Sequence, residues 1–159
     1  MTSPLPVPPA SPPAACPESA AVPAIVAFFE NLTPQSVADL PRLYAPHARF
    51  KDPFNDVTGL DAIAHIFEHM FVQLERPRFV VTQQVVQGSQ CFLTWEFHFG
   101  FKRFKRGQPQ VILGGTHLVL SDQGQITLHR DYWDAAEELY EKLPLLGNLM
   151  RWLKRRANQ

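Results

Sequence analysis

A carboxylate with histidine and tryptophan neighbours stands near the end of a strand-like run at residues 125–133, QITLHRDYW. Because successive side chains of a strand point to opposite faces, Asp131 shares a face with His129 and Trp133. Such a carboxylate is more typical of a pocket wall than of an exposed edge. In these surroundings it can act as a general base, and a nearby histidine can hold or receive the proton.

A second strand-like run, residues 91–102 (CFLTWEFHFGFK), has two distinct faces. If the mixed polar face points inward, Glu96 and His98 join the pocket. Pairing of the strand that contains Asp131 with the strand before it in the chain can also bring His117 and Gly115 to the side of Asp131. If the aromatic face points inward, the pocket is far more hydrophobic. The first arrangement predicts Asp131, His98 and His117 as catalytic residues, with a lining of Tyr44, Asp52, Met70, Leu74, Glu96, Gly115 and Trp133.

Several roles are open to this set of side chains. The first is general acid/base work on an apolar substrate, such as proton abstraction, isomerisation, dehydration or activation of water. The second is ligand binding without chemistry, and the third is an ion pair of Asp131 that only stabilises the mouth of the barrel. His65 and His69 are four residues apart but have no third ligand beside them, so we predict no metal and no cofactor.

Composition restricts the classes of protein that the chain can represent. It has 159 residues, enough for one domain with a core. A formal net charge of +0 gives no reason to expect nucleic-acid binding. Cys16 and Cys91 stand in unrelated contexts, there is no apolar run of about 20 residues, and the first seventeen residues lack Lys and Arg. We therefore expect a soluble, cytoplasmic protein.

The order of elements favours an α+β domain. A Pro/Ala-rich tail over residues 1–21 is expected to be disordered. A helix from Pro23 and another from Thr33, interrupted at Pro41, precede a strand at 48–51, a loop at 52–59 and a third helix to Leu74. Strands follow at 78–87, 90–102 and 109–120. A tight turn at residues 121–124 then makes a hairpin between 116–120 and 125–133.

The chain after Asp134 is expected to be helical. Residues 146–159 form a basic amphipathic segment, which we predict to be a helix docked on its own domain rather than on a membrane.

Several short motifs, in this order, resemble those of the SnoaL-like branch of the nuclear transport factor 2-like superfamily. They are Leu43-Tyr44-Ala45 to Phe50-Lys51-Asp52-Pro53, Gly59-Leu60-Asp61-Ala62-Ile63, and Gly124-Gln125-Ile126 leading into Arg130-Asp131-Tyr132-Trp133-Asp134. The resemblance covers about residues 22–145. It implies a cystatin-like roll, a curved antiparallel sheet wrapped by N-terminal helices into a cone, and a homodimer formed through the outer face of the sheet.

The segment RDYWD looks most like the closing strand of limonene-epoxide hydrolases, relatives of the ketosteroid isomerases. The resemblance implies that Asp131 matches the acid that activates water. The Arg-x-Asp pattern of those enzymes is replaced here by Glu96 and His98, and their Tyr and Asn fall near Phe50 and Asp52. The implied ligand is a small hydrophobic molecule of polyketide, steroid or terpenoid type, and the alternative is a non-catalytic dimeric scaffold with a filled cavity.

Overall fold

The structure, a computed structural model, describes residues 17–102 and 107–135. The predicted tail up to residue 16 and the predicted helix at 146–159 lie outside these residues. The elements in chain order are α1 (Pro17–Glu30), the 3-10 helix η1 (Ser36–Asp39), α2 (Leu40–Leu43), β1 (Tyr44–Lys51), β2 (Asp56–Thr58), α3 (Leu60–Gln73), β3 (Leu74–Gln87), β4 (Gln90–Phe101), β5 (Gln110–Leu120) and β6 (Ile126–Tyr132).

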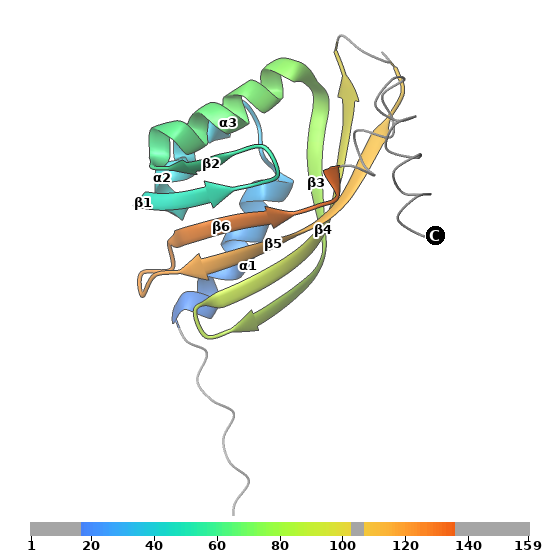
Figure 1. Ribbon diagram of the computed structural model, residues 1–159. Coiled ribbons are helices and arrows are strands. Elements are labelled where there is room, and N and C mark those ends of the chain that lie inside the picture. Colours follow the sequence, from blue (N-terminus) through green and yellow to red (C-terminus); the bar gives the residue numbers. More distant parts are fainter. Residues whose placement is uncertain (1–16, 103–106, 136–159) are drawn as a thin grey trace, which may run out of the picture.

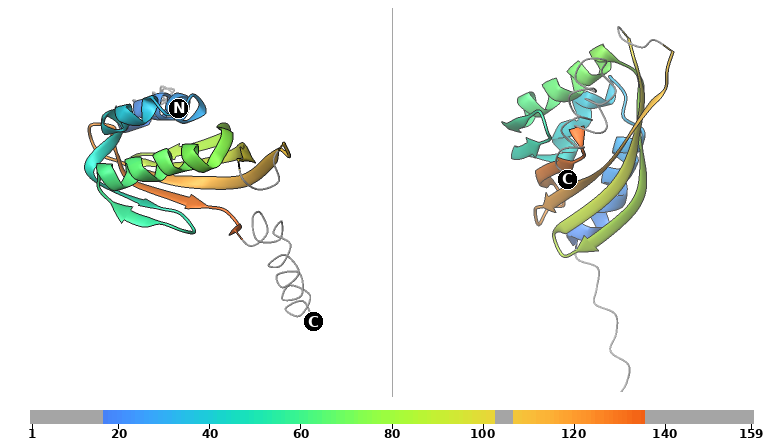
Figure 2. Two further views of the ribbon diagram at one scale, coloured as in Figure 1. Left: turned by 90° about the horizontal axis from the view of Figure 1, so that it is seen from above. Right: turned by 45° about the vertical axis from the view of Figure 1, so that its right-hand side comes forward.

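The strands form one curved, six-stranded sheet that does not close, in the order β2-β1-β6-β5-β4-β3 (Figure 1). Figure 2 shows α1 and α3 on its concave side. Within the described part of the chain, no helix is long and apolar enough to cross a membrane. The predicted α+β class, with helices wrapping a curved sheet into a cone, is confirmed.

The sheet is antiparallel except where β1 pairs with β6 in parallel, with Phe50 opposite His129. This pairing places a strand from the first third of the chain beside the last strand. α3, which follows β1 and β2, packs against both β1 and β3. Its buried residues Ile63 and Phe67 are four positions apart, as expected for one face of a helix.

α1 begins at Pro17, six residues before the predicted start, and contains Pro23 within it. Val22, Ile25 and Phe29 are buried at helical spacing, and this apolar stripe holds the helix on the sheet. The interruption expected at Pro41 is observed, because the chain changes there from η1 to the one-turn α2, in which Pro41 occupies the first turn.

The hairpin between β5 and β6 sets the register of the site. Gly124 has a φ of +76°, and its amide donates to the carbonyl of Ser121 over 2.8 Å, which closes the turn. The strands then pair so that Thr116 stands opposite Asp131 and His117 opposite Arg130. Since partners directly opposite share a face, Thr116 and Asp131 lie on the concave side.

Candidate functional site

The carboxylate of Asp131 is held through only one of its two oxygens. Oδ1 accepts hydrogen bonds from the Thr116 hydroxyl at 2.5 Å and from Nε2 of His129 at 2.9 Å. Within residues 17–102 and 107–135, no group donates to Oδ2. The side chain is only 15% exposed. One oxygen is therefore fixed and the other is available to a ligand.

The direction of the first of these hydrogen bonds follows from Trp95. Its indole Nε1–H donates to Thr116 Oγ1 over 2.8 Å, and an indole nitrogen can only donate. The single hydroxyl proton of Thr116 is then directed at Asp131. Trp95 thus donates to Thr116, and Thr116 donates to the carboxylate of Asp131. Hydrogen bonds donated to a carboxylate stabilise its ionised form.

His129 continues this network on the other side of the carboxylate. Its Nδ1 lies 2.6 Å from the hydroxyl of Tyr44, which is fully buried. If His129 donates through Nε2 to Asp131 and accepts at Nδ1 from Tyr44, the Tyr44 hydroxyl proton, both ring nitrogens of His129 and Oδ1 of Asp131 all have partners. That arrangement requires a neutral imidazole. A doubly protonated ring would leave the Tyr44 proton without an acceptor among the described residues.

Burial raises the pKa of Tyr44 well above its usual value, and the charge of Asp131 raises it further. Tyr44 therefore remains protonated and available as a donor. Aromatic rings enclose the His129 imidazole. Phe50 lies 4.7 Å from it and Phe29 5.6 Å, measured between ring centroids, so the ring is locked in place.

A glycine on β5 makes room for Trp95. Gly114 stands opposite Trp95, and a Cβ built on Gly114 would lie 2.3 Å from Cη2 of the indole. The ring occupies the place that a side chain on β5 would take. This allows Nε1 to reach Thr116, two residues further along β5.

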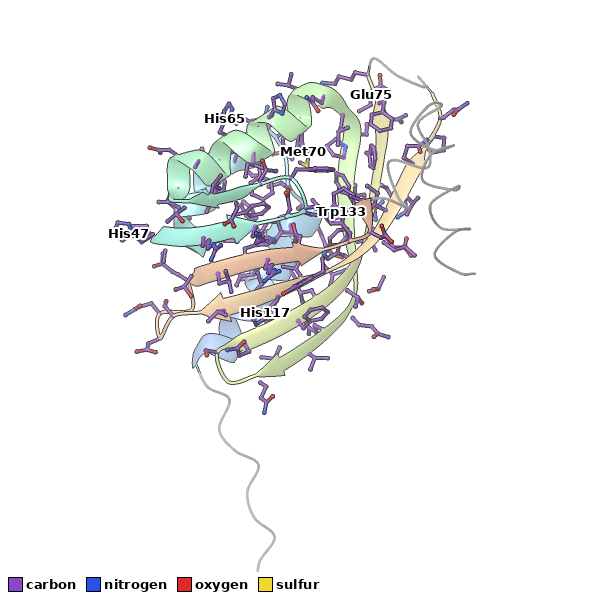
Figure 3. All side chains as sticks on the ribbon, in the orientation of Figure 1. His47, His65, Met70, Glu75, His117 and Trp133 are labelled. Carbon is purple, nitrogen blue, oxygen red and sulfur yellow. The ribbon has the colours of Figure 1, made fainter. Side chains whose placement is uncertain are left out.

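A cavity of about 530 Å³ lies between α3 and the sheet, and Asp131 is part of its wall. Met70 of α3 and Trp133, next after β6, both line this space, and Figure 3 labels the two residues. The wall is largely aromatic, and its residues are Phe50, Asp52, Phe54, Asn55, His65, Ile66, Phe67, His69, Met70, Gln73, Leu74, Phe79, Trp95, Phe97, Phe99, Phe101, Ile112, Asp131 and Trp133. A second space of about 30 Å³ also has Asp131 in its wall, together with Thr116 and His129.

The loop between β1 and β2 forms one side of the cavity mouth. Asp52 Oδ1 accepts from the amides of Phe54 and Asn55 at 2.7 and 2.6 Å, which fixes the loop. Phe54 is thereby held against Trp133, with ring centroids 5.4 Å apart at 72°. Phe54 is nevertheless 53% exposed, so this pair stands at the boundary between cavity and solvent.

The structure brings some of the sequence-predicted residues together around Asp131. Asp52, Met70, Leu74 and Trp133 line the same cavity. Tyr44 lies behind the cavity wall and reaches Asp131 only through His129.

The remaining predicted residues lie on the outer face of the sheet. The aromatic face of β4 points inward, so Glu96 and His98 point outward, where they form a pair at 2.8 Å. His117 contacts Gln90, and a Cβ on Gly115 would meet the exposed ring of Phe92. An inward position was expected for Glu96, His98, Gly115 and His117, and this expectation is wrong. The register of the strands places Gly114 and Thr116, not Gly115 and His117, on the side of Asp131.

Two residues outside the predicted site contact the carboxylate directly. His129 shares the face of Asp131 by strand alternation, and this signal was present in the sequence. Thr116 was not distinguishable from its neighbours without the register of the hairpin.

Among the described residues, no group of three or more His, Cys, Asp or Glu side chains is arranged to hold a metal ion. His65 and His69 stack with ring centroids 6.2 Å apart, and Gln73 rather than an acid contacts His69.

Residues 25–129, well over half of the chain, match the SnoaL-like domain family. The chain belongs to this family. A search of curated proteins gives no significant match to this SnoaL-like domain.

Solved structures of the same fold have little sequence identity to this SnoaL-like domain. One is a putative SnoaL-like polyketide cyclase from Jannaschia sp. (TM-score 0.66, 16% identity, 80% of this chain and 92% of that chain covered). Another is a protein with a ketosteroid isomerase-like fold from Catenulispora acidiphila, in complex with trimethylamine (0.63, 19%, 75% and 88%). A third is an LEH-like epoxide hydrolase from M. tuberculosis (0.61, 15%, 77% and 86%). At this level of identity the likeness establishes the fold alone.

Proposed function

We propose that this SnoaL-like domain binds a small, largely apolar molecule in its cavity and that Asp131 exchanges a proton with it. The observation that carries the proposal is the free Oδ2 of a carboxylate in the wall of an aromatic cavity of about 530 Å³. A cavity of this size is within the range that small-molecule ligands occupy. A cone filled by its own side chains would have favoured the scaffold role instead.

In the proposed reaction Oδ2 removes a proton from a carbon of the ligand or from water beside it. Asp131 becomes a carboxylic acid and the ligand or water gains the electron pair of the broken bond. His129 and Thr116 keep Oδ1 in place while this happens, so the base needs no reorganisation. Return of the proton to another carbon gives an isomerisation, and attack of the activated water gives a hydrolysis. The related structures include a putative cyclase and an epoxide hydrolase, so the fold does not select between these reactions.

The test is native mass spectrometry of the purified protein, with Asp131→Asn as the comparison. We expect a co-purifying apolar molecule in the wild type that is lost, or retained in a chemically different form, in the variant. Thermal shifts with a panel of hydrophobic metabolites provide the second measurement. An empty protein that no member of the panel stabilises would contradict the proposal.

A homodimeric assembly is also proposed, on a separate observation. The outer face of the sheet has the exposed apolar side chains Phe92, Leu113 and Tyr132, which are 42%, 59% and 45% exposed. A second copy covering this face would remove them from water. Sedimentation velocity of the wild type and of Leu113→Lys tests this: a dimer that the substitution dissociates supports it, and a monomeric wild type contradicts it.

A further inference from the structure

We propose that the molecule bound in the cavity carries a positively charged nitrogen, which lies between Asp131 and the aromatic wall. The inference rests on the proposed function, because it requires a ligand in this cavity. It adds that this ligand is positively charged, which an apolar cavity alone would not require.

The charges around the cavity support a cation. Asp52 and Asp131 are the acidic residues of the wall, and no Lys or Arg is among the described residues that line it. Asp52 is already engaged, since its oxygens accept two backbone amides and the side-chain amide of Asn55. Asp131 is therefore the acidic group that has an oxygen free for a ligand.

The network around Asp131 leaves its negative charge uncompensated. Thr116, which donates to Asp131, carries no charge. The His129 imidazole also carries none when its Nδ1 accepts the hydrogen bond from Tyr44. Lys51 and Arg130 line another space, of about 500 Å³, that also has Asp131 in its wall, but the ammonium of Lys51 is paired with Asp56 at 2.8 Å. Arg130 is on the outer face over the ring of Tyr132, and Arg78 stands opposite His98 on that same face. A ligand that presents only apolar atoms to Oδ2 would thus remove the carboxylate from water without compensation, a cost in desolvation that a cation avoids.

The aromatic wall accommodates the apolar part of such a ligand. Phe79 and Phe97 stack with centroids 4.4 Å apart, Phe97 and Phe99 follow at 5.1 Å, and Phe79 meets Trp95 edge to face at 5.6 Å. These stacked rings cover one another's faces, so they supply an apolar surface, and the carboxylate of Asp131 supplies the attraction for the charge. A carboxylate next to a row of such rings is suited to an ammonium group with an apolar body.

The experiment compares two ligands of the same shape, benzyltrimethylammonium and neopentylbenzene, which differ in having a charged nitrogen or a neutral carbon at the branch point. Dissociation constants are measured by NMR titration of the full chain. We expect the cation to bind the wild type about tenfold more tightly or better. Asp131→Asn is expected to reduce this preference to about threefold or less. Asp122→Asn, the same chemical change in the β5–β6 turn, retains the preference.

A second variant guards against loss of folding in Asp131→Asn. Asp131→Glu keeps a carboxylate at the same position, so it is expected to retain the preference for the cation that Asp131→Asn loses. Equal or tighter binding of neopentylbenzene to the wild type would overturn the inference and leave the proposed function intact. A preference that persists in Asp131→Asn would also overturn it. Failure of both ligands to bind would reject the binding cavity itself, and with it the proposed function.

Discussion

Nε2 of His129 lies 2.9 Å from Oδ1 of Asp131, although the two residues are only two positions apart on the same strand. Side chains at this spacing point to the same face, and the imidazole bridges the distance between them. The acid and its hydrogen-bond donor are therefore fixed by one strand in the middle of the sheet. Loop movements at the cavity mouth leave this contact unchanged.

The contact between Tyr44 and His129 should appear as an energetic coupling. His129→Leu removes the acceptor of the Tyr44 hydroxyl and leaves a buried donor unsatisfied, which we expect to lower the free energy of unfolding by about 1–3 kcal/mol. In the double variant with Tyr44→Phe, the unsatisfied donor is gone. Urea denaturation of the four proteins should give a coupling of about 0.5–3 kcal/mol. Strictly additive effects would show that the contact contributes nothing.

Alkaline pH should destabilise the protein through Tyr44. A free tyrosine loses its proton near pH 10, but burial raises the pKa of Tyr44, so the unfolded chain releases a proton that the folded one keeps. Stability is full below about pH 10 and falls as the pH rises toward the pKa of the folded state, by up to about 1.4 kcal/mol per pH unit. Denaturation of wild type and Tyr44→Phe between pH 9 and 11 isolates this loss. Parallel pH profiles of the two proteins would refute it.

Thr116→Val removes both a donor to Asp131 and the acceptor of the Trp95 indole. The buried Nε1–H then has no partner, so we expect a loss of about 1–3 kcal/mol in unfolding free energy. The matched control is Thr94→Val on the outer face, whose hydroxyl contacts the exposed Thr82 at 2.7 Å. That change should stay within about 0.5 kcal/mol of wild type. Equal effects of the two substitutions would argue against the buried network.

Gly114→Ala should displace Trp95. The new methyl group would lie 2.3 Å from the indole, so the ring must shift and lose its bond to Thr116. We expect destabilisation of about 1–3 kcal/mol and a change in tryptophan emission. Gly100→Ala is the control, because its Cβ would lie 3.4 Å from the side chain of Glu75, an ordinary contact. A Gly114→Ala protein with wild-type stability and emission would contradict the packing described here.

Phe54→Ala should open the cavity mouth. The substitution removes the ring that packs on Trp133, so a bound ligand is expected to dissociate faster, by about threefold to tenfold, with little change in stability, since Phe54 is half exposed. Val72→Ala is the control, because this exposed residue of α3 is not part of the cavity wall. Stopped-flow displacement of the ligand measures the rate. An unchanged rate in Phe54→Ala would place the exit elsewhere.

Much of the fold was predictable because it depends on local signals. The helical spacing of Ile63 and Phe67, the turn ending at Gly124 and the interruption at Pro41 each specify a backbone conformation in a short window of sequence. The start of α1 was misplaced because Pro23 has the fixed φ of a first helical residue, yet here it lies within a longer helix whose apolar face packs on the sheet.

The site was harder to predict because alternation defines two faces of a strand without saying which is buried. For β6 the sequence grouped Asp131 with Trp133 on one face, and both line the cavity. For β4 the choice between the Glu96 face and the Trp95 face depended on pairing with β5. The small residue Gly114 opposite Trp95 is the feature that decides it, and its meaning emerges only from the register.

The parallel pairing of β1 with β6 has a consequence for the order in which the protein can be assembled. Tyr44 and His129 are separated by 85 positions in the chain, so their contact closes a loop that includes most of the domain. Contacts of such long range are slow to form because the entropy of loop closure must be overcome first. During synthesis Asp131 and His129 emerge on β6, after every other described strand of the sheet. Asp131 and His129 are therefore among the last described residues to become structured, and a chain interrupted before β6 lacks both Asp131 and Trp133 of the cavity wall.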